Sequence, residues 1–71
     1  MPVAIGITEF HYYLLHSDCL TIMNRVTQVI EKVCELRGGL VLDMIFDKST
    51  SVYWIYSSTN VWRLDVSRED T

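Results

Sequence analysis

Residues 17–39 have the sequence SDCLTIMNRVTQVIEKVCELRGG, in which apolar residues recur at steps of four and three. This spacing places side chains on one face of an α-helix. The stripe consists of Cys19, Met23, Val26, Ile30 and Val33, widened by Leu20, Ile22, Val29 and Leu36. Ser17 and Asp18 are suitable N-cap residues, and Gly38 with Gly39 is typical of a helix end. The pattern predicts one amphipathic helix that begins at Ser17-Asp18 and ends at Gly38-Gly39.

The segments on either side of this stretch predict four strands. Residues 5–16 are rich in β-branched and aromatic types, which favour a pleated and half-buried surface. Residues 40–47 alternate between apolar and other side chains, and residues 52–57 and 61–66 are short runs bounded by turn residues. We therefore expect a two-layer α+β fold, with one helix packed on a four-stranded, mostly antiparallel sheet in the order βαβββ.

Length and composition indicate one small folded domain. The chain has 71 residues, of which 49% are hydrophobic, so we expect a single domain over residues 1–71 with frayed ends at 1–4 and 67–71. A membrane-spanning helix needs about 20 consecutive apolar residues, and the sequence contains no such run.

The two turns after residue 40 predict the register of the last three strands. A two-residue loop at Thr59-Asn60 would oppose Ile55 to Leu64, and a four-residue loop over residues 48–51 would oppose Met44 to Ile55. Both loop lengths place the same side chains on one face. That predicted core face carries Leu42, Met44, Phe46, Tyr53, Ile55, Trp62, Leu64 and Val66.

The opposite face of the predicted sheet has nothing to cover it, because a single helix protects only one side. Exposed aromatic residues beside an arginine are typical of protein-interaction sites. The predicted contact residues are Tyr13, Ile45, Trp54, Tyr56 and Arg63. The facing of the first strand stays open, because its residues 10–15 are apolar on both sides.

Charge and motifs argue against several other functions. The net charge of −3 does not suit nonspecific nucleic-acid binding, and Asp43, Asp47 and Asp65 on the aromatic face would repel phosphates. His11 and His16 lie five residues apart on a strand and point to opposite faces, so we expect no metal site and no cofactor. Stacking of single-stranded bases, and small-ligand binding in an oligomer, remain alternatives.

The cysteines predict neither catalysis nor a disulfide. A helix N-terminus and His16 could lower the thiol pKa of Cys19, but a structural role on the apolar stripe is favoured, and no catalytic residues are predicted. On one helix Cys19 and Cys34 would lie about 22 Å apart. A disulfide requires Cα atoms within about 7 Å. With no secretory leader visible in the first residues, we expect a reducing, cytoplasmic location.

These observations together predict a non-enzymatic module that binds another protein. A small sheet with one open face gains stability from self-association, so a homodimer is expected. The small size suits an accessory regulator or inhibitor, including one encoded by a phage or virus.

Overall fold

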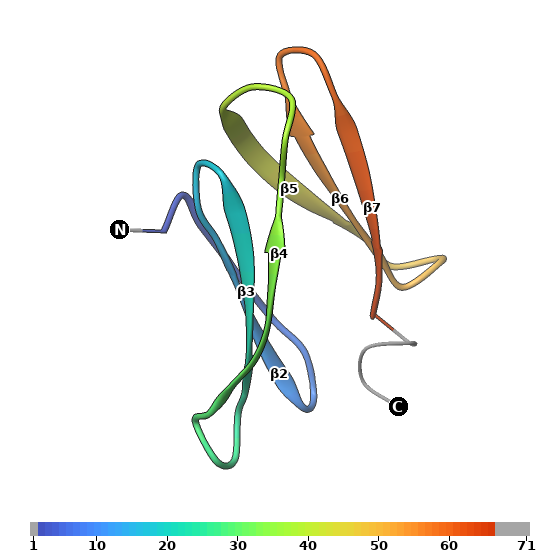
Figure 1. Ribbon diagram of the computed structural model, residues 1–71. Helices are drawn as coiled ribbons and strands as arrows, with labels where there is room; N and C mark the ends of the chain where they lie inside the picture. Colours follow the sequence, from blue (N-terminus) through green and yellow to red (C-terminus); the bar gives the residue numbers. More distant parts are fainter. Residues whose placement is uncertain (1, 67–71) are drawn as a thin grey trace.

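The structure, a computed structural model, describes residues 2–66, which form seven β-strands and no helix (Figure 1). The strands are β1 (Ala4–Ile7), β2 (His11–Leu15), β3 (Cys19–Asn24), β4 (Ile30–Glu35), β5 (Val41–Asp47), β6 (Val52–Ser57) and β7 (Val61–Asp65). They form two antiparallel meanders, a four-stranded sheet in the order β1-β2-β3-β4 and a three-stranded sheet in the order β5-β6-β7. The predicted α+β fold is therefore wrong, because the described part of the chain is all-β.

The predicted helix is a β-hairpin made of β3 and β4. Asn24 reverses the chain, because its side-chain oxygen accepts hydrogen bonds from the N–H groups of Val26 and Thr27 at 2.9 and 3.0 Å. Gln28 then takes a left-handed conformation with φ of 60°. Seven of the 23 residues in 17–39 are β-branched, and these side chains favour strands over helices.

The other predicted strands agree better with the structure. Residues 5–16 were expected to be one strand and instead form β1 and β2, joined by a turn in which the Thr8 N–H donates to the His11 carbonyl at 3.0 Å. The strands predicted at 40–47, 52–57 and 61–66 are confirmed as β5, β6 and β7, with bounds that differ by at most one residue. The predicted fraying of residues 67–71 lies outside the described residues.

The predicted register is confirmed for one hairpin and wrong for the other. Met44 opposes Ile55 and Phe46 opposes Tyr53, as expected. Ile55 opposes Trp62 rather than Leu64, because the Ser57 N–H donates to the Asn60 carbonyl and leaves Ser58-Thr59 as the loop. The shift is two residues, so the side chains of β6 and β7 keep their predicted faces.

The hydrophobic core lies between the two sheets. Its buried members come from both inner faces: Tyr13, Leu15, Leu20, Ile22, Leu36, Val41, Met44, Tyr53, Ile55 and Val66. Two predicted core residues are exposed, Leu42 by 55% and Phe46 by 40%. A β-bulge between Val41 and Asp43 explains Leu42, because the irregularity turns Val41 inward in its place.

The two sheets are joined through Gly38 and Gly39, which were expected to end a helix. Both glycines have positive φ angles, 123° and 104°, a region that most other residues avoid. The Gly38 carbonyl accepts a hydrogen bond from the Ser57 hydroxyl at 3.1 Å. The Asn60 side chain donates to the Arg37 carbonyl at 3.1 Å. These contacts hold the connection against the β6–β7 turn.

Within residues 2–66 no helix is long and apolar enough to cross a membrane.

Candidate protein-interaction surface

Three of the five predicted contact residues form one row across the second sheet. Ile45 of β5 opposes Trp54 of β6, which opposes Arg63 of β7. Ile45 is 60% exposed and Trp54 is 39% exposed, so the row presents an aliphatic, an aromatic and a cationic side chain side by side. We call the side of β5–β7 that carries this row the β5–β7 outer face.

Two further rows flank this one and give the β5–β7 outer face an acidic border. Tyr56, the fourth predicted contact residue, lies between Asp43 and Val61 and is half-buried. The third row contains Asp47, Val52 and Asp65. Hydrogen bonds from Ser49 hold the pKa of Asp47 below its usual range, with a smaller contribution from Thr50, so Asp47 is charged at neutral pH.

Tyr13, the fifth predicted contact residue, does not lie on this face. It is fully buried on the inner face of the first sheet, and its ring lies 5.6 Å from the ring of Tyr53 across the core. His11 and Leu15 share that buried face. Sequence reasoning failed here because β2 belongs to a different sheet from β5–β7, so its alternate residues do not continue the same surface.

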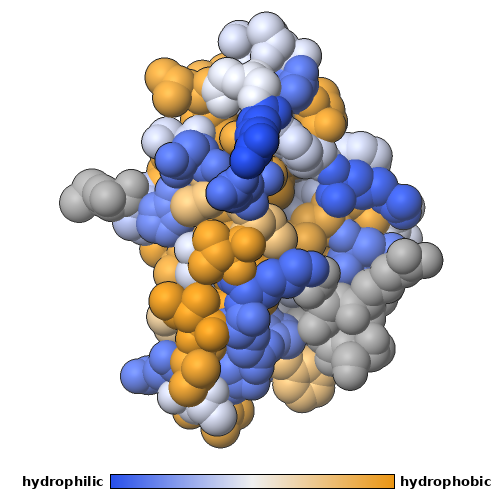
Figure 2. Space-filling model, in the orientation of Figure 1, coloured by the Kyte–Doolittle hydropathy of each residue, from blue (hydrophilic) through white to orange (hydrophobic). Residues whose placement is uncertain are grey.

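A second exposed surface was missed by sequence reasoning. One row of side chains across the first sheet runs from Ile5 of β1 to Val33 of β4. The next row runs from Ile7 to Ile30. All four of these terminal residues are exposed. The positions between them are Leu14, Thr21, Tyr12 and Met23. We call this side the β1–β4 outer face. Its rows could only be recognised once β3 and β4 were known to be strands, because a helical reading mixes their two faces. Figure 2 shows hydrophobic residues at the surface next to a hydrophilic band.

A polar cluster joins the edge of the first sheet to β2. Glu31 accepts hydrogen bonds from Asn24 Nδ2 at 3.0 Å and contacts His11 Nε2 at 2.8 Å. The hydrogen bond with His11, and then that with Asn24, holds the pKa of Glu31 below its usual range. No three potential metal ligands gather anywhere in residues 2–66. The contact between His11 and Glu31 ties the edge strand β4 to β2.

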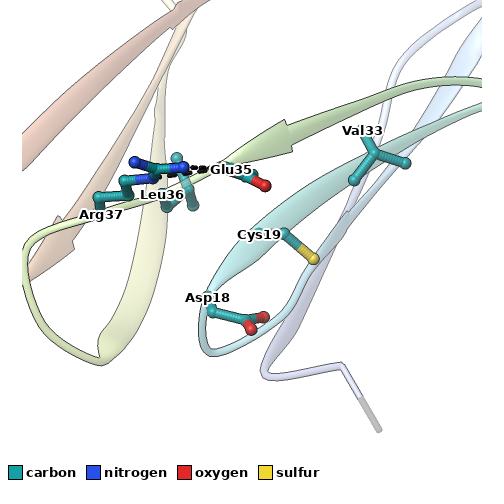
Figure 3. A pocket seen from close by; sticks show the side chains of 6 residues that line it. All are labelled: Asp18, Cys19, Val33, Glu35, Leu36 and Arg37. Atoms are coloured by element: carbon teal, nitrogen blue, oxygen red, sulfur yellow. Dashed lines mark hydrogen bonds and ion pairs between the residues drawn. The ribbon is translucent and has the colours of Figure 1, made fainter.

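A hollow of about 420 Å³ lies where β3 begins and β4 ends (Figure 3). It is lined by Asp18, Cys19, Val33, Glu35, Leu36 and Arg37. Arg37 and Glu35 form an ion pair across 2.7 Å. The Cys19 thiol has no helix N-terminus beside it, and burial raises its pKa, with a further contribution from the charge of Asp18. A raised pKa lowers the thiolate fraction, which works against the nucleophilic role considered for Cys19.

Both thiols are free, for a reason that differs from the predicted one. Cys19 opposes Glu35 and Cys34 opposes Leu20, so the two cysteines lie on adjacent strands. Neighbouring positions along a ladder point to opposite faces of the sheet, which separates the two sulfur atoms.

Comparison with known protein families explains the paired sheets. The model of the Pep3/Vps18/deep orange beta-propeller domain matches residues 2–66. The chain belongs to this family. No solved structure matches the chain. A β-propeller domain is a type of domain that mediates protein interactions, so a Pep3/Vps18/deep orange domain agrees with the predicted interaction module at this general level. The expectation of a phage or viral accessory protein is wrong.

The β1–β4 sheet of this Pep3/Vps18/deep orange domain has the strand number of a propeller blade, since propeller blades are four-stranded antiparallel sheets. Successive blades pack face to face around a common axis. In the described residues, β1–β4 and β5–β7 also pack through their inner faces around a shared core.

Proposed function

We propose that the chain is a non-catalytic module that binds another protein through the β5–β7 outer face and regulates that protein by occupying its surface. The observation that carries the proposal is the exposed Trp54 at the centre of this face, between Ile45 and Arg63. Tryptophan and arginine dominate the binding energy of protein interfaces, because each covers a large area and also forms polar contacts.

The border of this face defines the partner. Asp43, Asp47 and Asp65 surround the central row, so a partner with basic residues around an apolar centre is complementary to it. The same three carboxylates repel a phosphate backbone. Their arrangement favours a protein partner over single-stranded nucleic acid.

Self-association is part of the proposal, and it uses the other face. Ile5, Ile7, Ile30 and Val33 are exposed on the β1–β4 outer face. Charged side chains reach this face at Glu35, near the end of β4, and at Arg25, whose guanidinium lies 5.6 Å from the Tyr12 ring. Apolar patches of this kind on small domains commonly mark association sites. A second copy that covers this face would form a homodimer. The two free thiols support a reducing, cytoplasmic location.

The test compares proteins captured from a cell extract by the immobilised wild-type chain, by Trp54→Ala and by Phe10→Ala. Phe10 is a matched control, because it is also an exposed aromatic residue but lies in the β1–β2 turn, away from the β5–β7 outer face. We expect a partner that Phe10→Ala retains and Trp54→Ala loses by at least tenfold, as for an interface hot spot. Equal capture by all three proteins, with both variants folded, would overturn the proposal.

A further inference from the structure

We propose that two turns at one end of the first sheet insert their apolar side chains into the surface of a lipid bilayer. The turns are residues 8–10, between β1 and β2, and residues 25–29, between β3 and β4. Both lie at the lower end of the sheet in Figure 1, and we call them the paired turns. Neither belongs to the β5–β7 outer face, so the inference does not depend on the proposed function.

Arg25 holds the paired turns together. Its backbone N–H donates to the Phe10 carbonyl at 2.9 Å, and its guanidinium Nη1 donates to the Thr8 carbonyl at 2.6 Å. The same guanidinium lies 5.6 Å from the ring of Tyr12. The paired turns therefore form one preorganised tip, and binding through this tip orders no additional segment of the chain.

Apolar side chains project from this tip. Val26 is 86% exposed, Val29 is 57% exposed and Phe10 is 46% exposed. Turns usually carry glycine, asparagine, aspartate or serine, so valine and phenylalanine are unusual at these positions. Ile7 and Ile30, at the adjoining ends of β1 and β4, are also exposed and extend the apolar surface behind the tip. An exposed apolar cluster of this kind is typical of an interaction site.

The backbone of the longer turn is already hydrogen-bonded within the protein, which suits a bilayer. Asn24 accepts hydrogen bonds from the N–H groups of residues 26–28, twice through its side-chain oxygen and once through its carbonyl. The Val29 N–H donates to the Thr27 hydroxyl, and the Asn24 N–H donates to the Val29 carbonyl. Together with the bond between the two turns, every N–H group of residues 24–29 has a partner. Unbonded N–H groups are costly in lipid, and this turn brings none.

The charges of the paired turns indicate the kind of lipid that they suit. Glu9 and Arg25 are the only charged residues in the two turns, so their charges balance. Arg25 and Tyr12 lie behind the apolar tip, as cationic and aromatic side chains do at the headgroup level of a membrane. Because basic residues are not in excess, insertion of apolar side chains supplies the binding rather than attraction to anionic lipid. We therefore expect the tip to bind neutral phosphatidylcholine.

The first test measures flotation of the chain with phosphatidylcholine vesicles. Val26→Asp should lower the partition coefficient at least tenfold, because it places a charge at the most exposed apolar position. Val26→Leu should raise the partition coefficient about two- to fourfold, through one added methylene group. Val61→Asp is the matched control, since Val61 is also an exposed valine but begins β7 of the second sheet, and it should bind as the wild type does.

The second test locates the bound surface without any substitution. Phosphatidylcholine bicelles that contain a spin-labelled lipid should broaden the ¹⁵N–H NMR signals of residues 8–10 and 25–29 more than those of β6. Absence of vesicle binding, equal binding of Val26→Asp, or broadening centred outside the paired turns would each overturn the inference. Binding that requires phosphatidylserine and disappears at high salt would also overturn it.

The outcome is distinguishable from that of the proposed function. Trp54→Ala should bind vesicles as the wild type does, because Trp54 lies in the second sheet. Loss of partner capture in Trp54→Ala with normal vesicle binding tests the β5–β7 outer face alone, so the two proposals fail separately.

Discussion

Gly6 of β1 lies directly against Tyr53 of β6, across the space between the two sheets. A Cβ atom at Gly6 would lie 2.6 Å from Tyr53 Oη and 3.1 Å from Met44 Cε. No side chain larger than hydrogen fits there unless the tyrosine ring moves. The contact ties the two sheets into one packed unit, and it makes Gly6 a packing residue in a strand where glycine is otherwise unfavourable.

Substitution of Gly6 by alanine should therefore destabilise the fold by about 1–3 kcal/mol, as overpacking of a close-packed interior does. Urea denaturation measures this change. The double variant Gly6→Ala with Tyr53→Leu should lose less stability than the sum of the two single variants, because the shortened side chain leaves room for the methyl group. Additive effects would show that the two residues are not in contact.

Replacement of Tyr12 or Tyr13 of β2 by leucine should change the stability of the fold by very different amounts. Tyr13 is fully buried, whereas Tyr12 is half-buried on the β1–β4 outer face, with the Arg25 guanidinium 5.6 Å from its ring. Tyr13→Leu should cost more than about 2 kcal/mol, and Tyr12→Leu less than about 1 kcal/mol. Thermal unfolding of both variants checks the difference. Equal effects would contradict the facing of β2.

Stability should fall in acid partly because of Glu31. Its folded-state pKa is below the usual value, so its stabilising contribution is complete above that usual value and is lost as pH falls through the folded pKa. Unfolding curves measured between about pH 5 and pH 2 should show this loss in the wild type. Glu31→Gln should be less stable at neutral pH and should show a shallower decline. The pKa of Asp47 is also lowered, so the stability of Glu31→Gln should still fall to some extent as the pH decreases. Parallel curves for the two proteins would be the contrary result.

The Cys19 thiol should react slowly, because burial and the neighbouring Asp18 raise its pKa and reduce the thiolate fraction. Alkylation by iodoacetamide at pH 7.5, followed by mass spectrometry of the Cys19 peptide, should be slower than that of an unstructured thiol. Asp18→Asn should increase the rate, since it removes the second cause of the shift. A Cys19 rate faster than that of an unstructured thiol would revive its interpretation as a nucleophile.

The three strands after residue 40 were predictable because their signals are local. Alternation in residues 40–47 and the turn residues before Val52 and Val61 determine where each strand begins, and the Met44–Ile55 pairing follows from loop length. The β-bulge at Val41 and Asp43 has no such signal. It depends on how the strand meets the first sheet, and for that reason Leu42 was wrongly placed in the core.

The hairpin of residues 19–35 was not predictable from periodicity, because two short strands with a turn imitate a helical stripe. Leu20 and Ile22 alternate inward, and Asn24 interrupts the pattern after six residues of strand. The useful signals were the β-branched residues and the turn-forming Asn24. The error also affected the predicted contact residues. With residues 19–35 read as a helix, the first sheet is missing, so neither the burial of Tyr13 nor the β1–β4 outer face could be predicted.

The β1–β4 outer face and the packing of the two sheets require that residues 19–35 form a hairpin, and one NMR contact tests this directly. Thr21 opposes Val33, and the hydrogen bond from the Leu36 N–H to the Asp18 carbonyl makes Thr21–Val33 a non-bonded pair, whose Cα atoms lie about 4.5 Å apart. In a helix the same residues would be about 18 Å apart. The structure predicts a strong nuclear Overhauser effect between the Hα protons of Thr21 and Val33. Its absence, together with contacts between residues three apart along this segment, would contradict the all-β fold and the binding surfaces built on it.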